Sequence, residues 1–177
     1  LILLPEIALT NQFGRRFKDF FGVEPAIWHS AMTKKSRSII WKGVSEGKIK
    51  IIIGARSSLF LPFNRLGIII VDEEHDSSYK QDEGVSYNAR DMAIARASLE
   101  NIPISLVTSI PSIETFNNII NKKYSITRLT KRYKEANLPK IKIINLHNEH
   151  LKKNFWIAKT TINEVNKYLD NNDQVLF

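Results

Sequence analysis

An apolar run that ends in a cluster of acidic residues limits the possible folds of this chain more than any other stretch does. Residues 66–76 read Leu-Gly-Ile-Ile-Ile-Val-Asp-Glu-Glu-His-Asp, and residues 68–71 form an unbroken β-branched run. Such a run predicts a strand that is buried on both faces of a parallel sheet. Ligands of open parallel sheets bind just beyond the carboxyl ends of the strands, which is where Asp72 and Glu73 stand.

Two adjacent acids at such a strand end can carry out a specific chemistry. An aspartate can hold a hydrated Mg²⁺, and a neighbouring glutamate can orient or deprotonate an attacking water. The run therefore favours nucleotide hydrolysis that depends on Asp72 and Glu73. The alternative interpretation is a solvated acidic turn after a core strand, with no chemistry of its own.

Strand-like and helix-like stretches alternate along the chain. Strands are expected at 1–4, 25–28, 49–53, 67–71 and 103–107, helices at 9–21, 34–46, 88–99 and 112–122, and a polar loop at 76–86. This alternation predicts βαβ units, and therefore an α/β fold with a parallel sheet flanked by helices. A second set follows, with a strand at 141–146, a helix at 157–169 and the start of a strand at 175–177. We therefore expect a first lobe at 1–123, a basic linker at 124–140 and the start of a second lobe at 141–177.

Composition bears on partners and location. The 26 basic and 18 acidic residues give a net charge of +8, which suits a polyanion such as nucleic acid, although an AT-rich genome would also enrich lysine, isoleucine and asparagine. With no cysteine, these residues can form neither disulfides nor cysteine-ligated zinc sites. No signal peptide and no apolar span of about 20 residues is present, so a cytoplasmic protein without a membrane partner is expected. Both ends of the sequence lie in strand-like runs, which predicts an internal fragment of a longer protein.

Two further segments carry residues suited to nucleic acid. The loop at 76–91 interleaves aromatic rings with polar and cationic side chains, namely Tyr79, Lys80, Gln81, Tyr87 and Arg90. Aromatics stack on splayed bases while cations follow phosphates, so this loop is a candidate single-strand contact; the alternative is that its tyrosines pack back onto the domain. Arg56 and Ser57 follow Gly54 at a strand end and could grip a phosphate, unless Arg56 pairs with the acidic cluster instead.

Four segments, in one order along the chain, resemble motifs of the primosomal protein N′ (PriA) family of replication-restart DNA helicases. Residues 72–91 resemble its Walker B motif and aromatic-rich loop, 3–10 its motif Ia, 53–60 its motif Ib and 108–115 its motif III. The resemblance runs from Leu1 to Phe177. It implies a superfamily 2 P-loop NTPase core of two RecA-like lobes, here lobe 1 without its first strand and P-loop, plus the start of lobe 2.

The resemblance also implies roles for individual residues. Asp72 would hold the Mg²⁺ of Mg-ATP, Glu73 would be the catalytic base, and His75 would sense the γ-phosphate and relay its state to Thr108 and Ser109. Motif Ia would place Glu6 and Thr10 at the DNA edge. The family uses ATP, Mg²⁺ and zinc, with the zinc-binding cysteines outside this chain, and acts with other primosome proteins on single-stranded and forked DNA in 3′ to 5′ translocation.

Several departures from the family pattern affect what this chain can do. Ile110 stands where motif III usually has a threonine, and Val85-Ser86 where an aromatic and a basic residue are common. No Gly-x-x-x-x-Gly-Lys-Ser/Thr sequence occurs, so we expect no ATP hydrolysis by these residues alone. A non-catalytic nucleic-acid-binding remnant of a helicase is therefore an alternative, and a metal-dependent nuclease that uses Asp72, Glu73 and His75 is a weaker one.

Overall fold

The computed structural model describes residues 1–5, 11–131, 140–149, 151 and 156–176. The chain divides into two units, Leu1–Ile126 and Thr127–Phe177, which are described separately. This division falls within the basic segment at 124–140 that the sequence predicts to be a linker.

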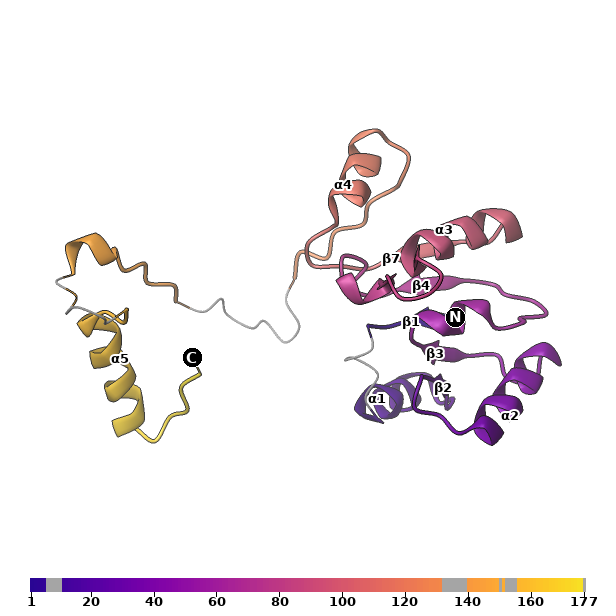
Figure 1. Ribbon diagram of the computed structural model, residues 1–177, viewed down its shortest axis with the longest axis horizontal. Helices are drawn as coiled ribbons and strands as arrows, with labels where there is room; N and C mark the ends of the chain where they lie inside the picture. The colour runs from indigo at the N-terminus through magenta and orange to yellow at the C-terminus, as the bar shows by residue number, and fades with distance from the viewer. Residues whose placement is uncertain (6–10, 132–139, 150, 152–155, 177) are drawn as a thin grey trace. The chain divides into compact units, whose positions relative to one another are not determined.

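The first unit is built on a five-stranded parallel sheet (Figure 1). Its strands are β1 (Ile2–Leu3), β2 (Ala26–Trp28), β3 (Ile52–Gly54), β4 (Ile69–Val71) and β7 (Ile104–Leu106). They lie in the order β2-β3-β1-β4-β7, and every pair is parallel. The expected α/β fold is confirmed, and each of the five predicted strands of this lobe is found.

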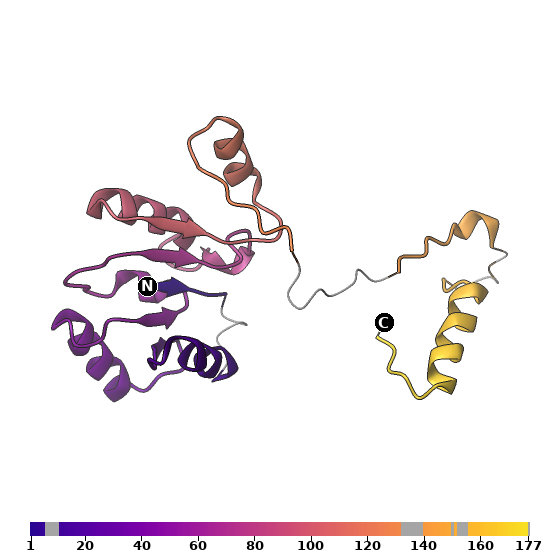
Figure 2. The same ribbon diagram turned by 180° about the vertical axis from the view of Figure 1, so that it is seen from behind.

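Three α-helices connect strands of this sheet, and a fourth follows β7. They are α1 (Asn11–Phe21), α2 (Lys34–Ser45), α3 (Ala89–Glu100) and α4 (Ile113–Ile120). Side-chain caps fix three of the helix starts: Thr33 accepts a hydrogen bond from the Ser36 amide, Asn88 from that of Arg90, and Ser112 from that of Thr115. In Figures 1 and 2, α1 and α2 lie beside β2, whereas α3 lies along β4 and β7.

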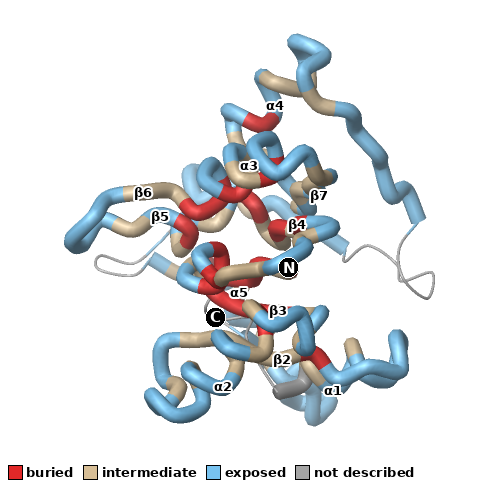
Figure 3. The backbone as a smooth tube through the Cα atoms, turned by 90° about the vertical axis from the view of Figure 1, so that its right-hand side faces the viewer, coloured by how far each residue is buried: buried red, intermediate tan, exposed pale blue. Residues whose placement is uncertain are grey.

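The core lies between the sheet and these helices. Leu3, Ile52, Ile69 and Val71 have no exposed surface, and Figure 3 shows buried residues concentrated in the strands and in α3. Each such side chain stabilises the fold by about 1.5–3 kcal/mol relative to an exposed one. The β-branched run before the acidic cluster forms β4, next to the central strand β1, with Ile69 and Val71 in the core; Ile68, which was expected to be buried, is 45% exposed.

Gly54 at the end of β3 is required by close packing. A Cβ atom there would lie 2.7 Å from the side chain of Ser58 and 2.8 Å from the carbonyl oxygen of Trp28. We expect Gly54→Ala to lower the free energy of unfolding by about 1–3 kcal/mol, because neither the buried serine nor the backbone can easily move away. Urea unfolding measures this, with Gly67→Ala as the control, since that position opens onto empty space. Equal stability of the two variants would contradict the expectation.

The polar loop predicted at 76–86 is more ordered than expected. It contains the short 3₁₀ helix η3 (Ser77–Tyr79) and an antiparallel hairpin of β5 (Lys80–Gln81) and β6 (Tyr87–Asn88). The Gln81 side-chain amide donates to the carbonyls of Glu83 and Val85, and Gly84 adopts a positive φ of 72°. These side-chain contacts close the turn, and periodicity alone does not reveal them.

The second unit contains one described α-helix, α5 (Lys159–Asp170), close to the helix predicted at 157–169. The strand predicted at 141–146 is wrong: residues 140–145 are irregular, and a 3₁₀ turn, η5 (Leu146–Asn148), follows. A strand needs a hydrogen-bonding neighbour, and the described part of this unit supplies none. Residues 175–176 are also not in a strand, and residue 177 lies outside the described residues. Across the described ranges, no helix has the length and apolar character that crossing a bilayer requires.

Candidate functional site

The acidic residues form a tight turn at the carboxyl end of β4. The amide of Asp72 donates to the carbonyl of Leu3 in β1, at 3.0 Å, and that of Glu74 donates to the carbonyl of Val107 beyond β7, at 3.1 Å. The turn is therefore anchored to both neighbours of β4. The sheet topology thus brings the predicted acids to its ligand-binding edge.

Glu73 has a strained backbone and a carboxylate oxygen without a hydrogen bond. Its φ of 46° lies in the left-handed region, which costs a non-glycine residue about 1–2 kcal/mol. Its Oε2 atom is buried and has no hydrogen-bond partner in the described structure, and the Nδ1 atom of His75 lies 3.5 Å from it. Strain and an unsatisfied buried oxygen at one residue are typical of functional sites.

The nearby Asp72 side chain is half-buried, and its carboxylate makes no hydrogen bond to the described residues. A carboxylate that is free at the edge of the sheet fits a hydrated Mg²⁺, which usually takes one or two protein carboxylates along with substrate phosphates. No group of three or more acidic, histidine or cysteine residues among those described could hold a metal by itself. The Asp72 carboxylate therefore fits a metal ion whose other ligands are nucleotide phosphates and water, rather than a metal ion held by protein side chains alone.

His75 and Thr108 are brought together as the resemblance implies. The His75 Nδ1 atom lies 2.7 Å from the Thr108 Oγ1 atom, across the gap between the acidic turn and the segment after β7. The Thr108 hydroxyl donates its own hydrogen to the carbonyl of Ile110 at 2.7 Å. The Thr108 oxygen is then an acceptor for His75, so a neutral His75 ring carries its proton on Nδ1. Ser109, the other predicted coupling residue, is exposed beside this contact.

Glu74 is a central residue that the sequence analysis missed. Its side chain is fully buried, and its two oxygens accept hydrogen bonds from Ser112, Thr115 and Arg90. Burial by itself would raise the pKa of the Glu74 carboxyl, but the hydrogen bonds from these three residues together hold that pKa below its ordinary value. Glu74 is therefore a structural anion directly beside the catalytic candidates.

The predicted nucleic-acid contact by Arg90 is corrected by this arrangement. The Arg90 side chain is 8% exposed, and its Nη1 atom lies 3.1 Å from Glu74 Oε2 and 2.7 Å from Ser112 Oγ. Its Nε atom donates to Asp91 at 2.8 Å. A guanidinium buried in these contacts is not available to a phosphate. The position of Arg90 in the first turn of α3 could have indicated that it is paired with a carboxylate. A cation there is unfavourable because of the helix dipole unless a nearby carboxylate compensates its charge.

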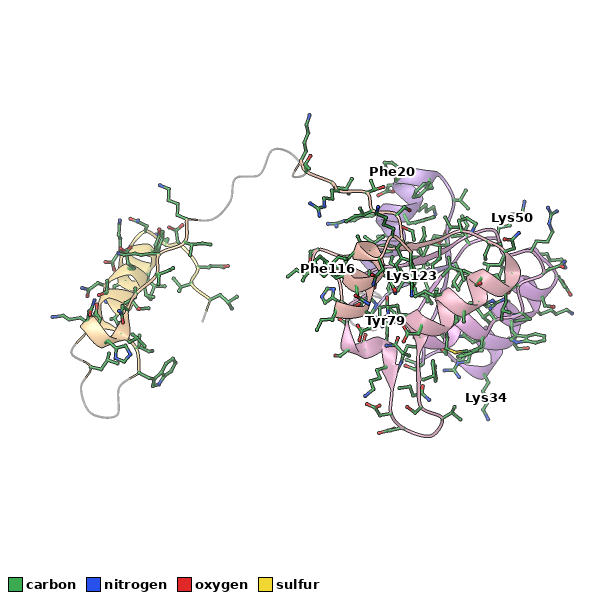
Figure 4. The ribbon with its side chains drawn as sticks, turned by 90° about the horizontal axis from the view of Figure 1, so that it is seen from above. Phe20, Lys34, Lys50, Tyr79, Phe116 and Lys123 are labelled. Atoms are coloured by element: carbon green, nitrogen blue, oxygen red, sulfur yellow. The ribbon has the colours of Figure 1, made fainter. Side chains whose placement is uncertain are left out.

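Tyr79 is likewise not a stacking platform. It is 1% exposed, and its hydroxyl lies 2.6 Å from the carbonyl of Asp72 and 3.1 Å from that of Leu3. Figure 4 shows Tyr79 inside the first unit, in contrast to Phe20 at its surface. Burial, together with the charges of the acidic turn, raises the pKa of the Tyr79 phenol. The Tyr79 side chain thus packs inside the domain and hydrogen-bonds the backbone of the acidic turn. This agrees with the alternative interpretation, in which the tyrosines of the loop pack back onto the domain.

The remaining nucleic-acid candidates gather around the hairpin and the 3₁₀ helix η2 (Arg56–Phe60). Arg56 donates to the carbonyl of Lys80 at 2.6 Å, and no ion pair joins it to the acids of the described chain, so it ties the hairpin to η2. The Ser57 hydroxyl accepts from the indole of Trp28 at 3.0 Å. Lys80 is exposed and lies 3.2 Å from Asp82, whereas Gln81 stabilises the turn of the hairpin. Glu6 and Thr10 lie outside the described residues.

Next to this group lies an aromatic pair, of which the sequence analysis identified Tyr87 but not Phe60. The rings of Phe60 and Tyr87 meet edge to face, with centroids 5.4 Å apart, and Phe60 is 55% exposed. Phe60 was missed because it ends the motif Ib segment, away from the aromatic-rich loop in sequence. Together these residues form one surface, called here the hairpin surface, which consists of Arg56, Ser57, Phe60, Lys80, Gln81 and Tyr87.

Comparisons with known proteins agree with this geometry. A family model for DEAD/DEAH box helicases matches residues 1–111. The protein named "Replication restart protein PriA" from Rickettsia conorii is 50% identical over 99% of this chain, and its namesakes from Haemophilus influenzae and Chlamydia pneumoniae are 40% and 38% identical over the same share. The resemblance read from the four motifs is thereby confirmed. The chain covers 27% of the first relative and 24% of the other two, so it spans about a quarter of their length.

Proposed function

Because the chain belongs to the DEAD/DEAH box helicase family, we propose that it supplies the hydrolytic acids and the DNA-coupling segments of an ATP-dependent replication-restart helicase. The observation that carries this proposal is the acidic turn after β4, where a Glu73 oxygen without a hydrogen bond lies 3.5 Å from His75 Nδ1, beside the bond between His75 and Thr108. In this proposal, the turn would bring a base and a relay to one edge of the sheet. The replication-restart role comes from the names of the curated relatives.

In this proposal, residues of the acidic turn divide the chemistry of hydrolysis. Mg²⁺ with ATP, when bound, supplies the electrophile and neutralises charge that develops on the phosphates. Asp72 would hold the metal, because its carboxylate is free at the carboxyl end of β4. Glu73 would orient and deprotonate the attacking water, since its buried Oε2 atom makes no hydrogen bond to the described residues and lies 3.5 Å from His75 Nδ1. A P-loop is absent from the sequence, so we infer that these residues do not hydrolyse ATP alone.

The contact between His75 and Thr108 would carry the coupling. It is a hydrogen bond between side chains of the acidic turn and of the segment after β7, and both side chains are accessible to solvent. A nucleotide bound at the acidic turn would change how often this hydrogen bond is formed. The segment that contains Thr108 and Ser109 would move as a result. Ile110 does not interrupt this path, because its backbone rather than its side chain bonds Thr108.

Single-stranded DNA would bind across the hairpin surface. Its exposed ring, Phe60, can stack on a base, while Lys80 can follow the phosphates. Tyr79 and Arg90 are excluded from this surface because they are buried. Forked DNA and other primosome proteins as partners, a zinc site in the remaining length of such a helicase, and a cytoplasmic location belong to the same proposal.

Removal of the exposed ring tests the hairpin surface. We expect Phe60→Ala to weaken binding of a labelled single-stranded oligonucleotide about tenfold, since stacking contributes about 1–3 kcal/mol per base. Fluorescence anisotropy measures the affinity. Phe20→Ala is the matched control, because Phe20 is an exposed ring on α1, at 82%, outside the hairpin surface. An equal loss of affinity in both variants would contradict the proposal that DNA binds at the hairpin surface.

The second candidate function is a non-catalytic nucleic-acid-binding module. The observation in its favour is that the sequence contains the hairpin surface but no P-loop. ATPase assays with and without single-stranded DNA, on a protein of the relatives' full length that carries this segment, separate the two. DNA binding without stimulated hydrolysis would favour the module. A nuclease is disfavoured, because the described residues contain no cluster of three metal-binding side chains.

A further inference from the structure

We propose that Glu74 is a positioning residue, whose buried carboxylate fixes the segment between β7 and α4 and thereby holds Thr108 against His75. The importance of this for hydrolysis rests on the proposed function, but the geometry itself can be tested without ATP or DNA. Glu74 is the middle residue of the acidic turn, between the proposed base Glu73 and the relay His75.

The carboxylate of Glu74 joins three elements of the fold. From α4, its Oε1 atom accepts from the amide of Ser112 at 2.7 Å, and its Oε2 atom accepts from the hydroxyls of Ser112 and Thr115, both at 3.0 Å. From α3, Oε2 accepts from Arg90 at 3.1 Å. A carboxylate at the start of a helix is also favoured by the helix dipole. The turn after β4 is therefore tied to α3 and to α4 by one side chain.

The same residue holds both ends of the segment that contains Thr108. At one end, the backbone amide of Glu74 donates to the carbonyl of Val107 at 3.1 Å. At the other end, its carboxylate accepts from Ser112. Between these points, the Thr108 Oγ1 atom makes two bonds to the backbone of Ile110, at 2.7 and 3.2 Å. The position of the Thr108 oxygen thus follows from the two attachments to Glu74.

The two links between the acidic turn and this segment differ in burial. The His75 side chain is 41% exposed, so its bond to Thr108 can exchange with water. The Glu74 side chain has no exposed surface, so its bonds are shielded from solvent. Glu74 therefore acts as the fixed attachment, and the bond between His75 and Thr108 is the contact that can open.

The negative charge of Glu74 is needed for this arrangement. In a glutamine, one of the two oxygens becomes an NH₂ group, which only donates hydrogen bonds. That group would face either the guanidinium of Arg90 or the amide of Ser112, and both of these are donors. A donor opposite a donor pushes the segment away, so Thr108 loses its position against His75.

The protonation pattern of the His75 ring reports this position. While Thr108 accepts from His75, the neutral ring carries its proton on Nδ1, and Nε2 is unprotonated. In the 177-residue chain, ¹⁵N spectra of labelled histidine at mildly alkaline pH should show a pyrrole-like Nδ1 and a pyridine-like Nε2 for His75. His75→Gln assigns the signals. If the native ring carries its proton on Nε2, the proposal is wrong.

Glu74→Gln is the decisive variant, and Glu114→Gln is its matched control. Glu114 is also near Arg90, at 3.8 Å, but its side chain is 71% exposed. We expect Glu74→Gln to reduce the difference between the two His75 nitrogen shifts, whereas Glu114→Gln leaves it unchanged. A folded Glu74→Gln protein with native His75 shifts would overturn the proposal.

A milder variant decides the matter if Glu74→Gln does not fold. Thr115→Val removes one hydroxyl bond to Glu74 and keeps both bonds from Ser112. We expect a smaller change of the same sign in the His75 shifts, and native shifts in this variant would contradict the proposal. Failure of the proposed function would appear differently, as absent ATP hydrolysis with normal His75 spectra.

Discussion

Glu73→Gln is expected to slow ATP hydrolysis by about 10²- to 10⁴-fold, the usual contribution of a general base. The setting is a protein of the relatives' full length that carries this segment, because the chain spans only 27% of the first relative. Glutamine preserves the shape of the side chain but cannot accept a proton from water. Steady-state ATPase rates with saturating single-stranded DNA measure the effect.

Nucleotide binding should survive this substitution. Glu73 makes no hydrogen bond through Oε2 within the described structure, and the pair that this oxygen forms with His75 Nδ1 at 3.5 Å joins two solvent-accessible side chains, so its loss should cost little stability. Affinity for a fluorescent ATP analogue is therefore expected to stay near the native value. Glu83→Gln is the control, because Glu83 is an exposed acid in the nearby hairpin turn. A Glu73→Gln protein that hydrolyses ATP at the native rate would remove Glu73 from the mechanism.

The sheet could be predicted from the sequence because its strands are short apolar runs with clear stops. The run at 68–71 and Gly54 at the end of β3 are local signals, and the strands form there, although Ile68 at the start of the run is exposed. The strand expected at 141–146 shows the limit of that reasoning. An apolar run becomes a strand only beside a partner strand, and the sequence of the run does not contain its partner.

The sequence predicts the site residues whose position follows from the strand order. It does not predict those whose position depends on contacts with side chains or carbonyls elsewhere in the chain. Asp72 and Glu73 follow a strand, so their position comes directly from the topology. Tyr79 and Arg90 look like ligands for DNA in the sequence, because aromatic and basic residues in a polar loop are usually exposed. Part of what buries them is distant in the sequence: Glu74 accepts from Arg90, and the carbonyl of Leu3, besides that of Asp72, accepts from Tyr79. The buried role of Glu74 could not be distinguished in the sequence, because it is one of four acidic residues within positions 72–76.

The buried pair of Glu74 and Arg90 leads to the largest expected change in stability. Glu74→Gln leaves the buried guanidinium with only the exposed carboxylates of Asp91 and Glu114 as counter-charges, and loss of the buried partner of such a pair typically costs about 3–5 kcal/mol. We expect the free energy of unfolding in urea at neutral pH to fall by that amount. The exposed Glu114→Gln control should change it by less than about 0.5 kcal/mol.

A double variant separates the charge from the packing. Replacing Arg90 with methionine in the Glu74→Gln protein removes the unpaired cation, so part of the lost stability should return. If the double variant is less stable than Glu74→Gln by the full cost of a further buried substitution, the two side chains do not act as a pair.

The pH dependence of unfolding provides an independent measure of the same carboxylate. The pKa of Glu74 is lower in the folded protein than its ordinary value, which is about 4.3 for an unfolded chain. As the pH falls through this range, the unfolded chain takes up the proton first, so the Glu74 contribution to stability is present above about pH 4.3 and is lost below it. Glu74→Gln has no such proton to bind, so its free energy of unfolding should decline less steeply on acidification than that of the native protein. Parallel curves for the two proteins, in urea titrations across the acidic range, would show that the Glu74 carboxylate contributes no charge-dependent stability.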